Sequence, residues 1–187
     1  KTALLYEAVT AGLPDEVDVV CYFLSRRASD ADSSRFLAAV VPQLAYLCEV
    51  DPPVADRDQF YALWAKAIDR AAEVSRPLLL VVDGLDEDIR PSGLPSVASL
   101  LPTLVGGRAH VLVASRPHPE LPVDVPDGHP LTPPSIRVDL QPFEGAKRLA
   151  DRARQEIYSL THGADADTAV EVLGLLTTAA GPLSEED

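Results

Sequence analysis

The sequence has no methionine, only two cysteines and a shortage of basic residues. Cys21 and Cys48 are too few to build a disulfide framework or a four-ligand zinc site. Lysine and arginine together number 16, against 29 aspartates and glutamates, which gives a net charge of −13. Sequence-independent binding to nucleic acid requires many basic side chains that displace counterions. The composition therefore argues against nucleic acid as a partner.

Long hydrophobic runs are also lacking. The longest strongly apolar run, residues 78–82, is far shorter than the roughly 20 residues that cross a bilayer. Hydrophobic residues make up 47% of the chain and charged residues 24%, which is the balance of an ordinary globular protein. We therefore expect a cytoplasmic domain without a membrane partner. Because the first residues read as the interior of a domain and the last as the start of a helix, we also expect an internal fragment of a longer protein.

The chain alternates between short apolar runs and amphipathic stretches. The apolar runs, which contain β-branched residues, predict buried strands at 18–24, 78–82, 111–114 and 136–140. Apolar residues at helical spacing predict helices at 2–11, 36–47, 60–71, 144–160 and 168–180. Either Asp32 or Ser33 can cap the second of these helices.

Strands that are apolar throughout are typical of a parallel sheet that helices cover on both faces. The alternation of strands and helices along the chain leads to the same architecture. We therefore predict an α/β fold, with a three-layer parallel sheet in residues 1–143. Residues 144–187 are predicted to form a helical segment that leads into a second, all-helical domain.

The segment Leu78–Glu87 (LLLVVDGLDE) joins an apolar strand to an acidic turn. Its strand leads to Asp83 at the carboxyl edge of the sheet, where open α/β folds bind ligands. Gly84 permits a tight turn there, and Asp86 and Glu87 add two further carboxylates. This arrangement suits a hard cation such as Mg²⁺ together with a carboxylate that activates water. The alternative is that Asp83 and Asp86 only cap or terminate local structure.

The segment Val111–Pro117 (VLVASRP) is a second strand with polar residues after it. We expect the guanidinium of Arg116 to emerge at the same edge of the sheet as Asp83. An arginine in that place can bind a phosphate through forked, charge-assisted hydrogen bonds. The alternative is a surface arginine that pairs with one of the many acidic side chains.

These segments, with Lys1-Thr2 at the start of an apolar helix, resemble a known family. Lys1-Thr2 matches the last two residues of the phosphate-binding loop G-x-x-x-x-G-K-[ST]. Residues 78–87 and 111–117 are similar to the Walker B and sensor 1 motifs of a NACHT domain, and RVDLQPF at 137–143 is similar to the strand that follows sensor 1. NACHT domains belong to the STAND class of signal-transducing P-loop ATPases. The glycine-rich loop and the strand before it are not in this sequence, so the resemblance implies an ASCE-type P-loop sheet that lacks its first strand.

The resemblance implies that ATP or ADP and Mg²⁺ are the cofactors. Lys1 would contact the β- and γ-phosphates, while Thr2 and Asp83 would hold the metal ion.

The resemblance also implies which residues act in catalysis. Asp86 and Glu87 would position or activate the attacking water, with Glu87 as the base. Ser115 and Arg116 would lie at the nucleotide, where Arg116 would sense the γ-phosphate.

The function implied by the resemblance is a nucleotide-dependent signalling switch. ATP binding and slow hydrolysis would control the conformation and oligomerisation of a larger multidomain protein. The partners would be an N-terminal effector and a C-terminal sensor domain of the same polypeptide, and further copies in an activated homo-oligomer. One alternative is a non-catalytic ADP-binding scaffold, against which the intact carboxylates count. Another is a Mg²⁺-dependent phosphatase or nuclease that uses the acidic residues 83–88.

The C-terminal residues Gly181-Pro182-Leu183 have two interpretations. They resemble the GxP element of the family's helical domain, whose proline packs near the adenine. They also resemble the turn between the first two helices of the winged-helix domain that follows in bacterial members.

Overall fold

The computed structural model describes residues 2–26, 31–105, 107–140, 144–163 and 166–178. The chain divides into two compact units, Lys1–Thr132 and Pro133–Asp187. The sequence analysis placed this division at residue 143. No helix in the described ranges combines the length and the apolar character needed to cross a bilayer.

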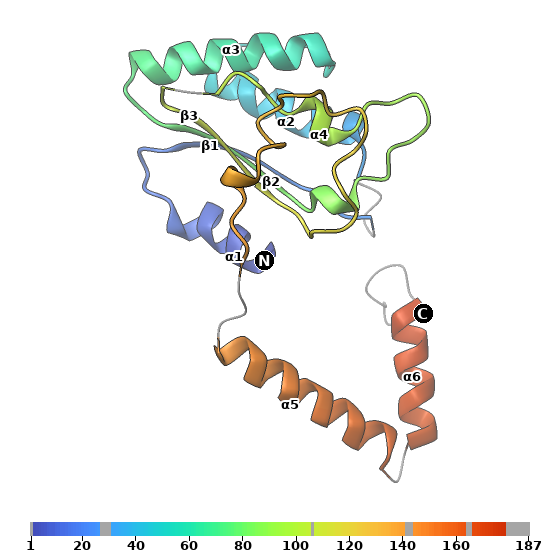
Figure 1. Ribbon diagram of the computed structural model, residues 1–187. Coiled ribbons are helices and arrows are strands. Elements are labelled where there is room, and N and C mark those ends of the chain that lie inside the picture. Colours follow the sequence, from blue (N-terminus) through green and yellow to red (C-terminus); the bar gives the residue numbers. More distant parts are fainter. Residues whose placement is uncertain (1, 27–30, 106, 141–143, 164–165, 179–187) are drawn as a thin grey trace. The chain divides into compact units, whose positions relative to one another are not determined.

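The first unit contains a parallel sheet of three strands: β1 (Asp18–Phe23), β2 (Leu78–Asp83) and β3 (Ala109–Ala114). The strand order is β1-β2-β3, so β2 is central. Phe23 is in register with Asp83, and Asp83 with Ala114, so all three strands end at the same edge (Figure 1). The predicted α/β class and parallel pairing are confirmed.

Three helices of the first unit lie where the apolar spacing predicts them: α1 (Thr2–Glu7), which continues as a π-helical turn (Ala8–Gly12), α2 (Ser33–Leu47) and α3 (Arg57–Glu73). The short helix α4 (Val97–Leu100) was not predicted. Asp32 is the N-cap of α2, because its carboxylate accepts the N–H of Arg35 at 2.9 Å. Asp56 caps α3 in the same way through the N–H of Gln59 at 2.8 Å. These caps satisfy backbone donors that have no partner within the helix.

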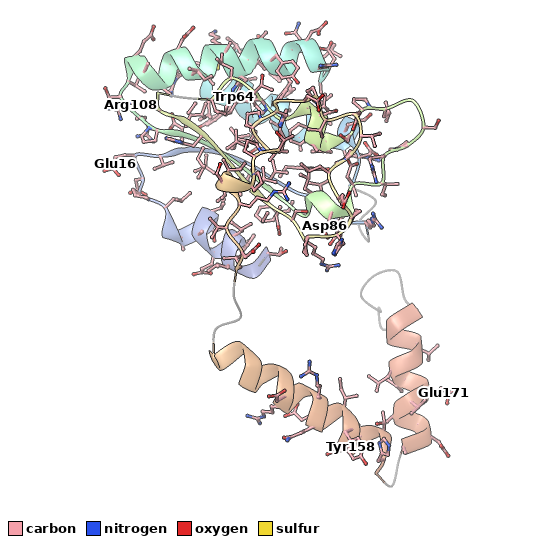
Figure 2. The ribbon with its side chains drawn as sticks, viewed as in Figure 1. Glu16, Trp64, Asp86, Arg108, Tyr158 and Glu171 are labelled. Atoms are coloured by element: carbon pink, nitrogen blue, oxygen red, sulfur yellow. The ribbon has the colours of Figure 1, made fainter. Side chains whose placement is uncertain are left out.

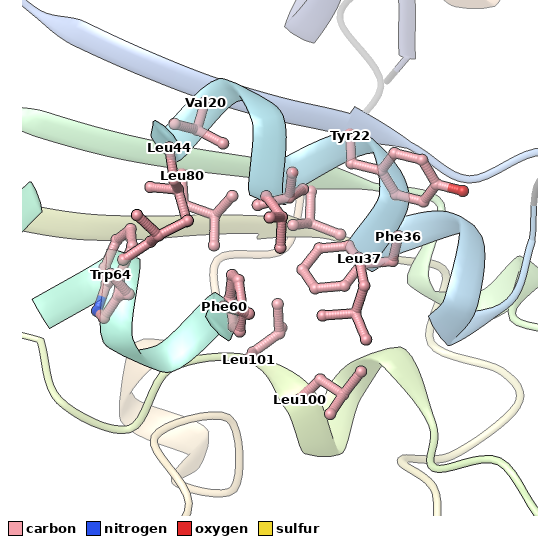
Figure 3. Close-up of a cluster of buried hydrophobic side chains, with 14 of the residues drawn as sticks. Val20, Tyr22, Phe36, Leu37, Leu44, Phe60, Trp64, Leu80, Leu100 and Leu101 are labelled. Carbon is pink, nitrogen blue, oxygen red and sulfur yellow. The ribbon is translucent and has the colours of Figure 1, made fainter. Parts of the chain in front are cut away.

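The hydrophobic core lies between the sheet and helices α2, α3 and α4, which share one face of it (Figures 1 and 3). Val20 and Leu80 project from β1 and β2 into this core and are fully buried. The rings of Tyr22, Phe36 and Phe60 follow one another edge to face, with centroids 5.6 and 5.5 Å apart. Burial of each large apolar side chain contributes about 1.5–3 kcal/mol, so this layer fixes the sheet on which the candidate site is built.

The opposite face of the sheet is only partly covered. Strand β2 is buried on both faces, as predicted, but His110 and Leu112 of β3 are exposed, Leu112 at 45%. The short helix α1 lies on this side and does not extend over the whole sheet (Figure 1). Within the described part of the first unit, the prediction that helices cover both faces is therefore wrong for β3, because a full helical layer lies on one face.

The outer edge of β1 is closed by a side chain. Gln43 of α2 accepts the N–H of Cys21 through Oε1 at 2.9 Å, and its Nε2 donates to the Cys21 carbonyl at 3.0 Å. The amide therefore satisfies both backbone groups of Cys21, as a neighbouring strand would.

The strand predicted at 136–140 does not form. Pro134–Ile136 is a 3₁₀ turn, and in the described part of the chain residues 137–140 pair with no strand. Val138 and Leu140 are 84% and 65% exposed. The prediction was wrong because an apolar run becomes a strand only where a neighbouring edge pairs with its backbone.

The second unit contains two helices, α5 (Glu144–Thr161) and α6 (Ala166–Thr178), which confirms the helical prediction for this region. Several apolar side chains on these helices are exposed, among them Ile157, Leu160, Val170 and Leu175. The residues with two interpretations, 181–183, lie outside the described residues.

Candidate functional site

The candidate site lies at the carboxyl ends of the three strands. We call this region the carboxyl rim and define it as residues 24–26, 83–88 and 114–116. Backbone pairing continues one residue past the strands, because Leu24 N–H donates to the Asp83 carbonyl at 2.9 Å and Gly84 N–H donates to the Ala114 carbonyl at 3.0 Å. The sequence analysis predicted that the strands leading to Asp83 and to Arg116 end at the same edge of the sheet, and the parallel pairing of β2 with β3 confirms this.

Gly84 allows the chain to turn at the end of β2. Its φ of +76° lies in the left-handed region, which residues with a side chain rarely adopt. A Cβ atom at this position would lie 2.7 Å from the Leu24 carbonyl oxygen, so the backbone leaving β1 passes directly against Gly84. Both the conformation and the close approach require glycine here.

Asp83 is the last residue of β2 and is only 2% exposed. Carboxylates at so buried a position are retained in proteins when they pair with other groups or bind a cation. The strand therefore holds one carboxylate inside the carboxyl rim, next to the turn that Gly84 begins.

Asp86 connects β2 to β3. Its side chain is 4% exposed, and its Oδ1 accepts the backbone N–H of Arg116 at 2.9 Å. The hydroxyl of Ser115 lies 3.5 Å from the same oxygen, and Nε of Arg116 lies 3.6 Å from Oδ2. Asp86 thus fixes the backbone just past β3, and Figure 2 labels it on this side of the sheet.

The side chain of Arg116 extends from this anchored backbone toward solvent. It is 71% exposed, so its long contact with Asp86 is screened by water and adds little stability. An exposed guanidinium on a fixed backbone can bind an anionic ligand that approaches the rim.

Glu87 is half-buried at the end of the 3₁₀ turn Leu85–Glu87. Its Oε2 accepts the backbone N–H of Arg26 at 3.1 Å. The side chain of Arg26 donates in turn to the carbonyls of Glu87, at 2.9 Å, and of Asp86, at 3.3 Å. The sequence analysis missed Arg26, although the expectation that parallel strands end at one edge also applies to the residues after β1.

The structure brings Asp83, Asp86, Glu87, Ser115 and Arg116 together at the carboxyl rim.

Two other site residues, Lys1 and Thr2, were named from the sequence. Lys1 lies outside the described residues. Thr2 is exposed in the first turn of α1. Tyr6 of that helix packs against Phe23 at the end of β1, with ring centroids 6.3 Å apart. Helix α1 therefore lies beside the carboxyl end of β1.

At the opposite edge of the sheet, where the strands begin, charged side chains form structural ion pairs. Asp18, which begins β1, pairs with Arg70 and with Arg76, each at 2.9 Å. Figure 2 labels Glu16 and Arg108 on this side, away from Asp86.

Two carboxylates fasten the loops next to the carboxyl rim. Asp88 accepts the N–H groups of Val97 and Arg90 at 2.8 and 3.2 Å, and burial raises its pKa. Asp124 accepts hydrogen bonds from the backbone and hydroxyl of Ser96, both at 2.7 Å, and from the hydroxyl of Ser99 at 3.1 Å. Burial alone would raise the pKa of Asp124, but these hydrogen bonds together lower it. The loop that contains Asp88 and the loop that contains Asp124 are therefore both anchored to the start of α4.

The described residues contain no group of three or more His, Cys, Asp or Glu side chains placed to hold a metal ion. A protein site that encloses a cation by itself is therefore not present in this part of the chain. A Mg²⁺ ion bound with a nucleotide needs fewer protein ligands, because phosphates and water supply most of its ligands and the protein adds one or two. The carboxylate of Asp83, fixed at the carboxyl rim, fits this smaller requirement.

Comparisons of the chain with family models, with curated proteins and with solved structures found no match.

Proposed function

We propose that the chain is the nucleotide-binding domain of a signalling switch, with the P-loop architecture of a NACHT domain. The observation that carries this proposal is that Asp83 ends one strand and Arg116 closely follows the end of its parallel neighbour, at one edge of the sheet. In this proposal the acid and the guanidinium serve one ligand. A magnesium nucleotide supplies the cation and the phosphate that these two groups complement.

Each side chain has a defined part in this proposal. Asp83 and the hydroxyl of Thr2 would hold the magnesium ion, and Lys1 would contact the phosphates. When bound, the metal ion would neutralise charge on the phosphates. Glu87 accepts a proton from the attacking water, and Arg116 donates to the γ-phosphate.

Asp86 has a further part in this proposal, besides the expected positioning of water. Its carboxylate is hydrogen-bonded to the backbone N–H of Arg116, so it orients the residue that senses the γ-phosphate. Movement of Arg116 on loss of that phosphate then displaces the turn after β2. In this way the nucleotide state reaches the rest of a larger cytoplasmic protein and controls its conformation and oligomerisation.

A second candidate is a non-catalytic scaffold that holds ADP. One observation favours it: Asp86 and Glu87 both accept hydrogen bonds from backbone N–H groups, at 2.9 and 3.1 Å, as purely structural carboxylates do. The two candidates share the binding site and differ only in turnover.

The test uses the protein with a glycine-rich loop before Lys1, which this function requires. Nucleotide that co-purifies is identified by chromatography, binding of fluorescent ATP is measured with and without Mg²⁺, and hydrolysis is followed with radiolabelled ATP. We expect Mg²⁺-dependent binding that Asp83→Asn weakens and that the exposed control Asp69→Asn does not. Slow turnover supports the switch, whereas tightly held ADP without turnover supports the scaffold. Absence of any nucleotide binding would contradict both.

A further inference from the structure

Arg26 lies three residues beyond the end of β1, the strand farthest from Arg116 in the sheet order. Within the described part of the chain, three hydrogen bonds join it to the turn after β2. The backbone N–H binds the Glu87 carboxylate at 3.1 Å, Nε binds the Glu87 carbonyl at 2.9 Å, and one terminal nitrogen binds the Asp86 carbonyl at 3.3 Å.

These bonds hold both the backbone and the side chain of Glu87. A 3₁₀ turn is short and poorly stabilised by its own hydrogen bonds, and here the N–H of Glu87 bonds back to the Gly84 carbonyl at 2.7 Å. A guanidinium that binds two successive carbonyls fixes the plane of the peptide between them. The orientation of the Glu87 carboxylate therefore depends on the segment that leaves β1.

The two sides of the turn are held by different strands. Asp86 connects it to the end of β3 through Arg116, and Arg26 connects it to the end of β1. The turn after β2 is thus hydrogen-bonded to the segments that follow β1 and β3. The residue that Arg26 binds is Glu87, the catalytic carboxylate of the proposed function.

We infer that Arg26 is a positioning residue, which sets the orientation of Glu87 for water activation without touching the nucleotide. This inference rests on the proposed function for its effect on turnover. A group that activates water must be within hydrogen-bond reach of it, and a displacement of about 1 Å can reduce a rate about 10²-fold.

The first measurement does not depend on the nucleotide. Hydrogen–deuterium exchange of residues 84–89 is compared in the wild type, in Arg26→Ala and in Arg35→Ala, an exposed arginine of α2 that serves as the control for loss of charge. We expect exchange in this segment to become about 10-fold faster in Arg26→Ala, because opening of the turn no longer breaks two charge-assisted hydrogen bonds. Unchanged exchange would overturn the inference.

The second measurement separates positioning from general loss of structure. Arg26→Ala is expected to lower kcat about 10²-fold with little change in the KM for ATP, and Arg26→Lys, which keeps one donor, to have a smaller effect. In a Glu87→Gln background the Arg26→Ala change should cost no further activity, because it acts through Glu87. The same loss in both backgrounds, or no loss in either, would refute a positioning role.

The two proposals fail differently. A wild-type protein that binds no nucleotide refutes the proposed function, and hydrogen exchange alone then decides whether Arg26 orders the turn. A protein that hydrolyses ATP equally well with alanine at position 26 keeps the function and refutes the role of Arg26.

Discussion

The Asp86 carboxylate accepts the backbone N–H of Arg116 at 2.9 Å and thereby joins the turn after β2 to the end of β3. The two residues are thirty positions apart in the sequence, so only the parallel pairing of the strands brings them together. The carboxylate is nearly buried, and a hydrogen bond shielded from water is stronger than the same bond at the surface. The place of Arg116 at the carboxyl rim therefore depends on Asp86.

Replacement of Asp86 is expected to reduce the stability of the domain. Asp86→Ala leaves the N–H of Arg116 without its acceptor, which costs about 1–3 kcal/mol, whereas Asp86→Asn keeps one acceptor oxygen and should cost less. Urea unfolding measures both, with Asp69→Ala on the exposed face of α3 as a control expected within about 0.5 kcal/mol of the wild type. Equal stability of the alanine and asparagine variants would show that this hydrogen bond does not matter.

The turn at Gly84 should not tolerate a side chain. Gly84→Ala combines a positive φ with a contact of 2.7 Å to the Leu24 carbonyl. Gly93→Ala is the matched control, because Gly93 has a φ of +86° and nothing within 4 Å of its added Cβ. We expect Gly93→Ala to lose about 1 kcal/mol and Gly84→Ala to lose at least about 1 kcal/mol more, as measured by urea unfolding. Similar losses would mean that the backbone at Leu24 moves aside freely.

Glu87→Gln should slow hydrolysis without displacing the turn. Glutamine keeps a carbonyl oxygen for the N–H of Arg26 but cannot take a proton from water. Turnover of ATP should fall about 10²–10⁴-fold, the range for loss of a general base, in single-turnover assays with radiolabelled ATP. The control is Glu73→Gln at the exposed end of α3, and turnover that is unchanged in Glu87→Gln would remove Glu87 from this role.

Arg116→Ala should distinguish ATP from ADP. A charge-assisted hydrogen bond to the γ-phosphate contributes on the order of 1.5–3 kcal/mol, so ATP affinity should fall about 10- to 100-fold more than ADP affinity. Calorimetric titration of both nucleotides measures this difference, with Arg108→Ala at the opposite edge as control. Equal losses for the two nucleotides would contradict the sensor role.

The loop anchored by Asp124 should weaken in acid. Because the hydrogen bonds from Ser96 and Ser99 lower the pKa of Asp124 in the folded protein, its contribution to stability is complete above the ordinary value of 3.8 and disappears as the pH falls through the lowered value. Because Asp124 is exposed and water screens its interactions, Asp124→Asn should cost at most about 1 kcal/mol at pH 7, and the difference from the wild type should shrink below about pH 4.

Thermal unfolding at several pH values measures the effect of Asp124. The control is Asp127→Asn, an exposed residue of the same loop. A difference between wild type and Asp124→Asn that is the same at pH 3 and pH 7 would exclude the ionised form as the anchor.

The elements that the sequence predicted correctly are those whose pattern of apolar residues lies within the element itself. The stripes of α2 and α3 follow the helical repeat, and residues such as Phe36 and Phe60 that define these stripes are fully buried. The strand that ends at Asp83 is apolar along its whole length because it is central in the sheet. From this strand and the next, the proximity of Asp83 and Arg116 could be predicted before the structure was known.

The features that the sequence did not predict depend on long-range partners. The run 136–140 has strand composition, but composition cannot say whether an edge is available for pairing. The contact of Arg26 with Glu87 spans sixty-one residues, and nothing in the local pattern distinguishes Arg26 from other surface arginines. The hydrogen bond from the backbone of Arg116 to Asp86 likewise depends on a distant partner, and the predicted part of Asp86 in positioning water stays a prediction.

The hydrogen bonds of Gln43 to Cys21 determine at which edge of the sheet a further strand can pair. A strand approaching Cys21 from outside finds its N–H and C=O already bonded to an amide. Addition of another strand, from this chain or from a second one, is therefore favoured at the outer side of β3. One glutamine on a helix thus also protects the molecule against edge-to-edge aggregation through β1.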